Sequence, residues 1–345
     1  MITIYDVAKK AGVCHGTVSR CLNNKGYVKK ETRRRIERAA KKLKYTPNYT
    51  AQVLITKKTQ IIGVLIPDIS NPFYPPVTKG VYDTVKKSGY HIILGNSYNE
   101  LEEENSILKS FLFRGVDGII FICTEKKEEE STSQILEEFI KRDIPIVLIQ
   151  RDGVNLSVDR IFINNIKGAY EATLHLIDIG HNRIGFISGA TKSISSRERK
   201  EGYRKALLKH NLLIDRNLVL EKGLGKEGGY EGMKQFLKME HPPTAVFAVN
   251  DVIAMGAMMA IKERGKKIPE DIALVGFDDI YPSAILNPSL TTVSQPKYEQ
   301  GRLAAQLLVR RMTGDKDCFP ENITLDTRLV IRESTLRKKY AKIKN

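Results

Sequence analysis

Polar side chains that can bond nucleic acid stand close together near the start of the chain. His15, Thr17, Ser19 and Arg20 fall within a span of six residues. A helix that carries them would fit the major groove of DNA, where an arginine bonds a guanine edge through two donors and hydroxyl groups bond phosphates. The segment therefore predicts a DNA-reading helix, in which Arg20 bonds either a guanine or a phosphate.

The positive charge of the chain is concentrated in the same region. The net charge is +16, and residues 1–60 hold 15 Lys and Arg against 3 Asp and Glu, which leaves the other residues close to neutral. Such a basic segment attracts the phosphate backbone of nucleic acid. The alternative that charge alone leaves open is a solvated run of charge without a partner.

A second set of candidate residues comes later in the chain, directly after apolar stretches. Its members are polar or aromatic: Asp68, Asn71, Phe73, Tyr74, Gln150, Asn250 and Asp278. Open parallel sheets bind ligands at the carboxyl ends of their strands, so this set predicts a ligand site. For Phe73 and Tyr74 two alternatives stay open: each could line the ligand site or belong to the hydrophobic core. Asp251 is expected to cap a helix.

Short helices are predicted to position the first set. Thr3 and Asp6 can cap a helix that ends at Ala11, and further helices are expected over His15–Leu22, with Leu22 inward, and Lys30–Leu43. From Gln60 onward, apolar strands alternate with amphipathic helices, which predicts parallel sheets covered on both faces.

Eight strands and five helices are predicted for this second part. The strands are Ile61–Pro67, His91–Asn96, Gly118–Cys123, Pro145–Gln150, Ile161–Asn164, Arg183–Gly189, Thr244–Asn250 and Ile272–Gly276, and the helices Tyr74–Ser88, Leu101–Phe113, Gly168–Ile179, Arg197–Asn211 and Val252–Arg264. These units are enough for two sheets. A TIM barrel also has eight units but would need catalytic residues at the strand ends, and no coherent set is found. The predicted fold is an all-α helix-turn-helix head and an α/β body of doubly wound parallel sheets.

The first twenty residues resemble the helix-turn-helix of the lactose repressor (LacI) family. The matching pieces are Tyr5-Asp6-Val7-Ala8, Ala11-Gly12-Val13 and Thr17-Val18-Ser19-Arg20, and downstream Tyr45-Thr46-Pro47-Asn48 with Ala51 and Leu54. Two separated matches in register make the resemblance specific, and a weaker likeness extends to about Glu333. It implies a DNA-binding transcription regulator, expected to be a repressor, with the two-lobed fold of periplasmic sugar-binding proteins and control by a small-molecule effector.

The resemblance also assigns roles within the head. In the family, the first two exposed positions of the recognition helix choose operator bases, and here they are His15 and Gly16. Because Gly16 has no side chain, direct readout is expected from His15 and Arg20. Phosphate contacts that set the register are expected from Thr3, Tyr5, Thr17, Ser19 and Asn23. The third helix lacks the Ser or Thr cap that is frequent in the family, which is expected to weaken its start.

Residues 48–56 correspond to the family's hinge helix. Asn48 and Ala51 belong to this segment, which is too short to be helical alone but could fold when paired with its copy on DNA. Leu54 matches the leucine that wedges into the minor groove and kinks the duplex. The alternative for Leu54 is a linker residue packed on the body.

One residue of the ligand site rests on the resemblance. Arg199, in Arg199-Lys200-Glu201-Gly202-Tyr203, matches the family's Arg-x-x-Gly-aromatic, whose arginine commonly bonds the effector. Aromatic faces, carboxylates and an arginine suit a sugar or sugar derivative. Two positions depart from the family, which often has Asp where Gln150 stands and an aromatic residue where Leu224 stands. A nucleobase or a phosphorylated metabolite therefore stays open.

The domains follow from these assignments. Residues 1–47 are expected to bind DNA, 48–59 to form the hinge and linker, and 60–345 the effector-binding and dimerisation core. Its lobes are expected at about 60–160 with 294–318 and about 161–293 with 319–335. A homodimer on a pseudo-palindromic operator is expected, because one head contacts too little DNA for tight specific binding.

Location and cofactors follow from what the sequence lacks. The start is not a signal peptide, and no apolar run approaches the roughly 20 residues of a membrane helix, so a cytoplasmic protein is expected. The cysteines show no C-x-x-C spacing, which predicts reduced thiols, no metal and no cofactor.

Three other functions compete with regulation. An enzyme is disfavoured because no zincin, nucleophile-elbow or complete phosphate-loop motif is present. A secreted binding protein would share the body but not the basic segment. A non-specific DNA binder is distinguished by a shallow dependence of affinity on DNA sequence at fixed salt.

Overall fold

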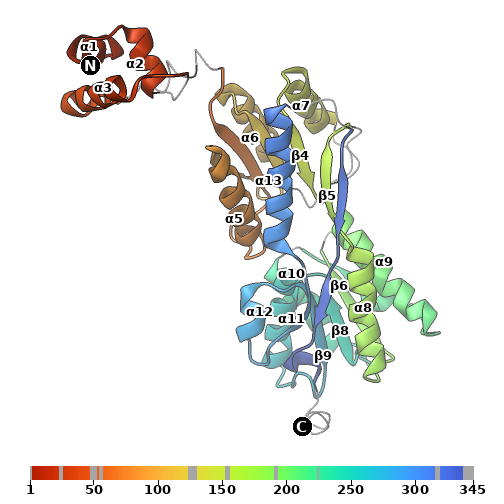
Figure 1. Cartoon of the computed structure of the whole chain (residues 1–345). Coiled ribbons are helices and arrows are strands. Elements are labelled where there is room, and N and C mark those ends of the chain that lie inside the picture. The colour runs from red at the N-terminus through yellow and green to blue at the C-terminus, as the bar shows by residue number, and fades with distance from the viewer. Residues whose placement is uncertain are drawn as a thin grey trace. The chain divides into compact units, whose positions relative to one another are not determined.

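The computed structural model describes residues 2–22, 26–46, 53, 57–122, 130–151, 156–189, 193–223, 225–314 and 319–336. The chain divides into two compact units, the head (Met1–Thr59) and the body (Gln60–Asn345) (Figure 1). Each unit has a hydrophobic core of its own.

Within residues 2–22 and 26–46, the head contains three helices: α1 (Ile4–Ala11), α2 (His15–Leu22) and α3 (Lys30–Leu43). The predicted cap of α1 is present, because the Asp6 amide donates to Thr3 Oγ1 at 3.4 Å and the Thr3 amide donates to Asp6 Oδ2 at 2.8 Å. Gly12 ends α1 at a φ of 63°, in the left-handed region that glycine adopts without strain. Lys29 precedes α3 without a side-chain capping bond.

The core of the head is small and made mostly of aliphatic side chains. Val7, Val18 and Ile36 are fully buried, one from each helix, and Cys21 joins them. Leu22 is half-buried and packs against this core beside the fully buried Val18, as predicted, and Cys21 completes the buried side of α2.

The body contains two six-stranded sheets, each the centre of one lobe. The N-lobe sheet has the order β11-β5-β4-β3-β1-β2 and is parallel throughout. Its strands are β1 (Ile61–Ile66), β2 (His91–Asn96), β3 (Gly118–Ile122), β4 (Ile146–Ile149), β5 (Asp159–Ile163) and β11 (Asn322–Leu325). Two hydrophobic clusters cover its two faces, one built with α5 (Tyr74–Val85) and α13 (Lys297–Thr313), the other with α6 (Leu101–Arg114) and α7 (Glu130–Lys141).

The C-lobe sheet has the order β12-β10-β9-β8-β6-β7, and only β12 runs antiparallel to its neighbour. Its strands are β6 (Ile184–Ser188), β7 (Val219–Glu221), β8 (Ala245–Ala248), β9 (Ala273–Asp278), β10 (Thr291–Ser294) and β12 (Arg328–Val330). The helices of this lobe are α8 (Asn165–Asp178), α9 (Ile194–Lys209), α10 (Lys226–Leu237), α11 (Asp251–Glu263) and α12 (Tyr281–Ile285). Short 3-10 turns cover Lys86–Ser88, Arg216–Leu218 and Glu333–Thr335.

The chain crosses between the lobes after β5, after β10 and after β11. The N-lobe therefore contains β5 and β11, most of which the sequence-based limits had assigned to the C-lobe. Both strands extend one edge of the N-lobe sheet, since β5 pairs with β4 and β11 pairs with β5.

The helix α13, which follows the crossing after β10, packs closely on α5. A Cβ atom at Gly301 of α13 would lie 1.9 Å from the carbonyl oxygen of Val77, and one at Gly80 would lie 2.1 Å from that of Tyr298. Only glycine permits this approach. The first turn of α13 is thereby fixed against the N-lobe.

The eight predicted strands all exist, with ends that differ by a few residues. The strands β7, β10, β11 and β12 were missed, as were α7, α10, α12 and α13. β10 shows the reason: Thr291-Thr292-Val293-Ser294 has the polarity of a loop, yet Thr291 and Thr292 are fully buried and their hydroxyls bond Arg332 O and Asp251 Oδ1.

Candidate functional site

The recognition helix α2 presents polar side chains at the surface of the head. His15 and Arg20 are exposed, and Thr17 and Ser19 are half-buried. Arg20 Nη2 donates to Thr17 Oγ1 at 3.4 Å, and the Tyr5 ring lies 5.0 Å from the His15 ring. Tyr5 of α1 and four side chains of α2 thus form one surface.

The remaining predicted DNA contacts are of three kinds. Gly16 faces open space, with no atom within 4 Å of the position that a Cβ would take. Thr3 is exposed and also caps α1. Asn23, Asn48, Ala51 and Leu54 lie outside the described residues.

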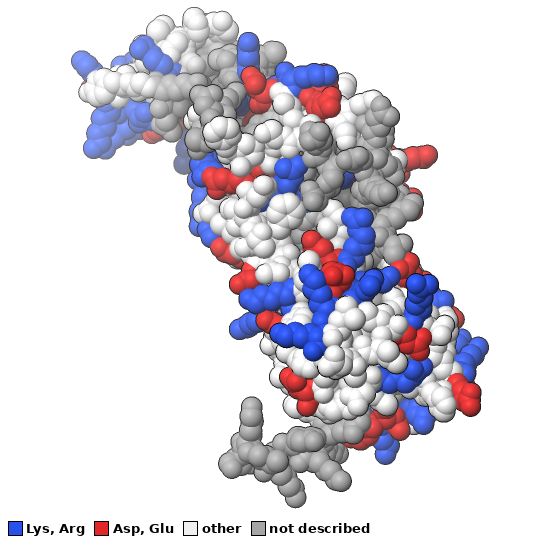
Figure 2. All heavy atoms as spheres, turned by 90° about the vertical axis from the view of Figure 1, so that its right-hand side faces the viewer, with Lys and Arg blue, Asp and Glu red and all other residues white. Residues whose placement is uncertain are grey.

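Two of the many basic side chains of the head have structural roles, and one of them, Arg33, donates from Nη1 to the carbonyl oxygen of Cys21 at 3.2 Å. Arg35 Nη2 donates to the carbonyl oxygen of Ala11 at 2.5 Å and to that of Gly12 at 3.3 Å, which satisfies the end of α1. Other Lys and Arg side chains are exposed on the head, whereas both signs of charge are interspersed on the visible face of the body (Figure 2).

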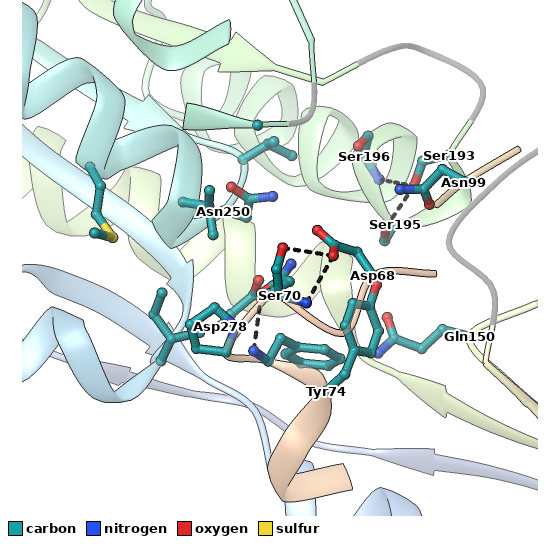
Figure 3. A pocket seen from close by; sticks show the side chains of 18 of the residues that line it. Asp68, Ser70, Tyr74, Asn99, Gln150, Ser193, Ser195, Ser196, Asn250 and Asp278 are labelled. Carbon is teal, nitrogen blue, oxygen red and sulfur yellow. Dashed lines mark hydrogen bonds between the residues drawn. The ribbon is translucent and has the colours of Figure 1, made fainter. Parts of the chain in front are cut away.

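A cavity of about 420 Å³ lies between the lobes of the body. All eight residues predicted for ligand binding line it: Asp68, Asn71, Phe73, Tyr74, Gln150, Arg199, Asn250 and Asp278. Figure 3 shows Asp68, Tyr74 and Gln150 on the side opposite Asn250 and Ser196. The volume falls within the range of about 300–1,000 Å³ that is usual for small-molecule sites.

Arg199 is the best anchored of these residues. It is 5% exposed, its Nε donates to Asn165 Oδ1 at 3.0 Å, and its Nη1 donates to the carbonyl oxygen of Val249 at 2.7 Å. The guanidinium carbon lies 3.7 Å from the centre of the Phe277 ring. Nη2 makes no hydrogen bond to the described residues, so its N–H donors are available to a ligand in the cavity that Arg199 lines.

Asp278 lies beside Arg199 at the end of β9. Its Oδ1 is 3.2 Å from Arg199 Nη1 and accepts a bond of 2.6 Å from Gln295 Nε2, while Oδ2 has no hydrogen bond to the described residues. Burial raises the pKa of Asp278, and the positive charge of Arg199 opposes that rise. A φ of 114° shows that its backbone is held in a conformation unusual for an aspartate.

Asn250, rather than Asp251, caps α11. Its Oδ1 accepts from the Ile253 amide at 2.8 Å, which leaves the side-chain nitrogen for the cavity. The expectation that Asp251 caps a helix was wrong. Asp251 is fully buried, and its Oδ2 accepts from the Ile280 amide at 2.9 Å and from Ser283 Oγ at 2.7 Å. Asp251 therefore ties α11 to the segment after β9.

The N-lobe wall combines a turn with an aromatic pair. Asp68 Oδ1 accepts from the Ser70 amide at 2.9 Å, and Asn71 Oδ1 accepts from the Phe73 amide at 3.0 Å. The rings of Phe73 and Tyr74 meet edge to face at 5.2 Å, and both are buried. These rings line the cavity and also belong to the N-lobe core, so both positions that the sequence left open for them, at the cavity and in the core, are occupied at once.

Several residues of the cavity were not predicted. Ser193, Ser195 and Ser196 line it at the start of α9, where Ser193 Oγ accepts from the Ser196 amide at 3.3 Å. A serine directly before the first residue of a helix, as Ser193 stands before Ile194, is a recognisable cap, and this signal could have pointed to the site. The others are Ser70, Pro72, Asn99, Gly225, Val249, Val252, Met255, Ile280 and Pro282.

No helix among the described residues is long and apolar enough to cross a membrane. Within the same residues, no group of three His, Cys, Asp or Glu side chains is placed to hold a metal ion.

A helix-turn-helix head joined to a two-lobed body with a cavity between its lobes is an architecture that known protein families share. Residues 3–48 match the model of bacterial regulatory proteins of the lacI family, and residues 173–335 match a periplasmic binding protein-like domain. The transcriptional regulator RegA of Clostridium saccharobutylicum is 37% identical over 97% of this chain and 99% of its own length. The transcriptional repressor PurR of Mannheimia succiniciproducens is 34% identical over 97% and 98%.

Solved structures agree with these relatives. A lac repressor dimer bound to operator and the anti-inducer ONPF superposes with a TM-score of 0.86 at 27% identity, over 97% of this chain and 99% of that one. A complex of the transcriptional regulator CelR with cellobiose has a TM-score of 0.73 at 31% identity, over 97% and 100%.

The chain belongs to the lacI family of bacterial regulatory proteins. It is a DNA-binding transcriptional regulator with an effector-binding domain, as the resemblance predicted, and its relatives are regulators rather than enzymes. The predicted fold is confirmed as well.

Proposed function

We propose that the chain represses transcription as a cytoplasmic homodimer on a pseudo-palindromic operator and that a sugar or sugar derivative in the cavity controls its affinity for DNA. The observation that carries the proposal is the convergence of eight separately predicted residues on one cavity between two lobes. A ligand there contacts both lobes and can favour one lobe orientation by as much as its differential affinity for the two.

The chemistry of the cavity supports a sugar. Arg199 Nη2 is an open donor, and Oδ2 of Asp278 is an open acceptor close to it. Neighbouring hydroxyls of a sugar can donate to the carboxylate and accept from the guanidinium. Apolar side chains, among them Tyr74 and Ile280, suit the C–H face of a ring. The complex of CelR with cellobiose is a structural relative with such a ligand.

The surface of the head supports the DNA roles. We assign base readout to His15 and Arg20, because both are exposed on α2 while Gly16 offers no side chain. Phosphate contacts are assigned to Thr3, Tyr5, Thr17, Ser19 and Asn23. Asn48, Ala51 and Leu54 are proposed to contact the minor groove as a paired hinge, with Leu54 as the wedge.

A thermal-shift screen of the full chain tests the effector class. Ribose, cellobiose, adenosine, purine bases and the phosphates of the same sugars are added singly, because a ligand of the folded state raises Tm by mass action. The proposal expects the largest shift from an unphosphorylated sugar or a sugar derivative. A shift produced only by a purine base or by a phosphorylated compound would replace the sugar assignment.

A further inference from the structure

Three glutamine side chains join the two lobes behind the cavity. Gln150 directly follows β4 of the N-lobe, Gln300 lies in the first turn of α13, and Gln295 lies between β10 and α13. All three are buried, with exposed fractions of 9%, 0% and 3% respectively. Of the three, only Gln150 lines the cavity.

Their amides form a chain of hydrogen bonds with one direction. Gln150 Nε2 donates to Gln300 Oε1 at 3.0 Å and to Gln295 Oε1 at 3.3 Å, and Gln300 Nε2 donates to Gln295 Oε1 at 3.3 Å. Gln295 Nε2 then donates to Asp278 Oδ1 at 2.6 Å. The chain therefore ends on the carboxylate that pairs with Arg199.

The carboxylate determines this direction. The guanidinium of Arg199, 3.2 Å from Asp278 Oδ1, favours the ionised carboxylate, which only accepts hydrogen bonds, so Gln295 turns its nitrogen to Asp278 and its oxygen to the other two glutamines. Gln150 and Gln300 must then turn nitrogens to that oxygen. The carbonyl oxygen of Gln150 is left over, and it makes no hydrogen bond to the described residues. The Gln150 amide could turn either its nitrogen or its oxygen to the cavity. Because its nitrogen is bonded to the other glutamines, it presents its oxygen, which is a hydrogen-bond acceptor.

The backbone gives a second, independent sign that both ends of this chain are held in place. Gln150 has a φ of 54° and directly follows β4, Asp278 has a φ of 114° and ends β9, and both residues line the cavity. Residues with a side chain seldom adopt these angles, and such strain persists where surrounding contacts over-determine the conformation.

We infer that Gln295 and Gln300 are positioning residues that hold the Gln150 carbonyl oxygen toward the effector, and that the effector meets it with a hydrogen-bond donor such as a hydroxyl group. The inference rests on the proposed function, because it describes how the same cavity selects its ligand. A group that only accepts hydrogen bonds would leave two acceptors facing each other in a closed site, which costs binding energy.

The first test needs no ligand. Thermal unfolding of the full chain is followed for Gln150→Leu, Gln295→Met and the double variant, with Gln306→Met, an exposed glutamine of the same helix as Gln300, as the control. We expect both single variants to lower Tm and the double variant to lower it by less than the sum, because the residues share one network. If the two decreases in Tm add up in the double variant, the chain of hydrogen bonds between the glutamines is not the shared network that we infer.

The second test separates positioning from mere structural support. Binding of ribose, cellobiose and adenosine is measured by titration calorimetry beside derivatives in which one hydroxyl is replaced by fluorine, which cannot donate. For a parent that binds, one derivative should bind about tenfold more weakly to the wild type. That penalty should fall below about threefold in Gln150→Leu and in Gln295→Met.

The outcomes distinguish the two levels of the proposal. A full penalty in Gln295→Met, or no penalised derivative in the wild type, overturns the positioning role. If ribose, cellobiose and adenosine all fail to bind, the proposed effector class fails. The chain of hydrogen bonds between the three glutamines is then decided by the unfolding test alone. A loss of stability without a change in the fluorine penalty means that Gln295 supports the fold only, which also overturns the inference.

Discussion

Nη1 of Arg199 lies 3.2 Å from Oδ1 of Asp278, and each side chain is less than a tenth exposed. The two charges compensate each other in a buried site. Nη2 of Arg199 and Oδ2 of Asp278 make no hydrogen bond to the described residues. We propose that the pair serves both the stability of the C-lobe and the binding of a ligand. The two roles can be separated experimentally.

Arg199→Ala should abolish effector binding and also destabilise the body. Removing the guanidinium leaves Asp278 buried without its partner, a change that typically costs about 3–5 kcal/mol. Arg199→Ala with Asp278→Asn should recover part of the unfolding free energy but not the binding. Denaturant unfolding and ligand titration of both variants check this, with Arg204→Ala, an exposed arginine of α9, as the control. Ligand binding by Arg199→Ala at wild-type affinity would mean that the ligand lies elsewhere.

Arg20→Ala should weaken specific DNA binding by roughly 1–3 kcal/mol and relax the base preference at one position in each half-site. Lys10→Ala should instead weaken binding to all sequences alike and flatten the salt dependence, if that side chain reaches a phosphate. Affinities for a selected operator and for random DNA of equal length, at one salt concentration, decide between the roles. An equal loss on both DNAs for Arg20→Ala contradicts base readout.

Gly16→Ala should stabilise the head by about 0.5–1 kcal/mol, because alanine favours a helix and its methyl group meets no atom within 4 Å. Gly12→Ala is the matched contrast and should destabilise the head, since its φ is 63° and the new Cβ would lie 3.0 Å from Arg35 Nη2. Hydrogen exchange of the α1–α3 amides in the full chain measures both. Faster exchange in Gly16→Ala would show that position 16 is not open.

Asp251 should make the stability of the body depend on pH. Burial, and next the negative charge of Asp278, raise the pKa of Asp251 from 3.8 to about 7. The folded state then binds more protons than the unfolded state between about pH 4 and 7, so this group's contribution to stability falls as pH rises through that window. Asp251→Asn should reduce the change in unfolding free energy between pH 5 and 8, whereas the exposed control Asp326→Asn should not. An unchanged pH dependence in Asp251→Asn contradicts the assignment.

The parts of the structure that follow local rules could be predicted from the sequence. The cap formed by Thr3 and Asp6 and the turn at Gly12 depend on neighbours within a few residues. Seven of the eight predicted residues that line the cavity were predicted because parallel strands end at one edge of a sheet, and the eighth, Arg199, because the family motif marks it.

The parts that depend on distant residues could not be predicted. Gln150 meets Gln295 and Gln300, which lie 145 and 150 residues later, and no local pattern pairs them. Asp251 precedes the predicted helix Val252–Arg264 as a cap would, yet in the structure it is buried, and its carboxylate accepts hydrogen bonds from the hydroxyls of Thr292 and Ser283. β11 joins the N-lobe sheet after the chain has passed through the C-lobe, and nothing in its short, half-exposed sequence marks that return.

The most direct test of effector-controlled DNA binding is the affinity of the full chain for an operator selected from random DNA, measured by fluorescence anisotropy with and without a saturating ligand from the thermal-shift screen. We predict a change of about 5- to 150-fold, which corresponds to a coupling of roughly 1–3 kcal/mol, and the same factor when ligand affinity is measured with and without operator. An operator affinity that saturating ligand leaves unchanged would contradict the account.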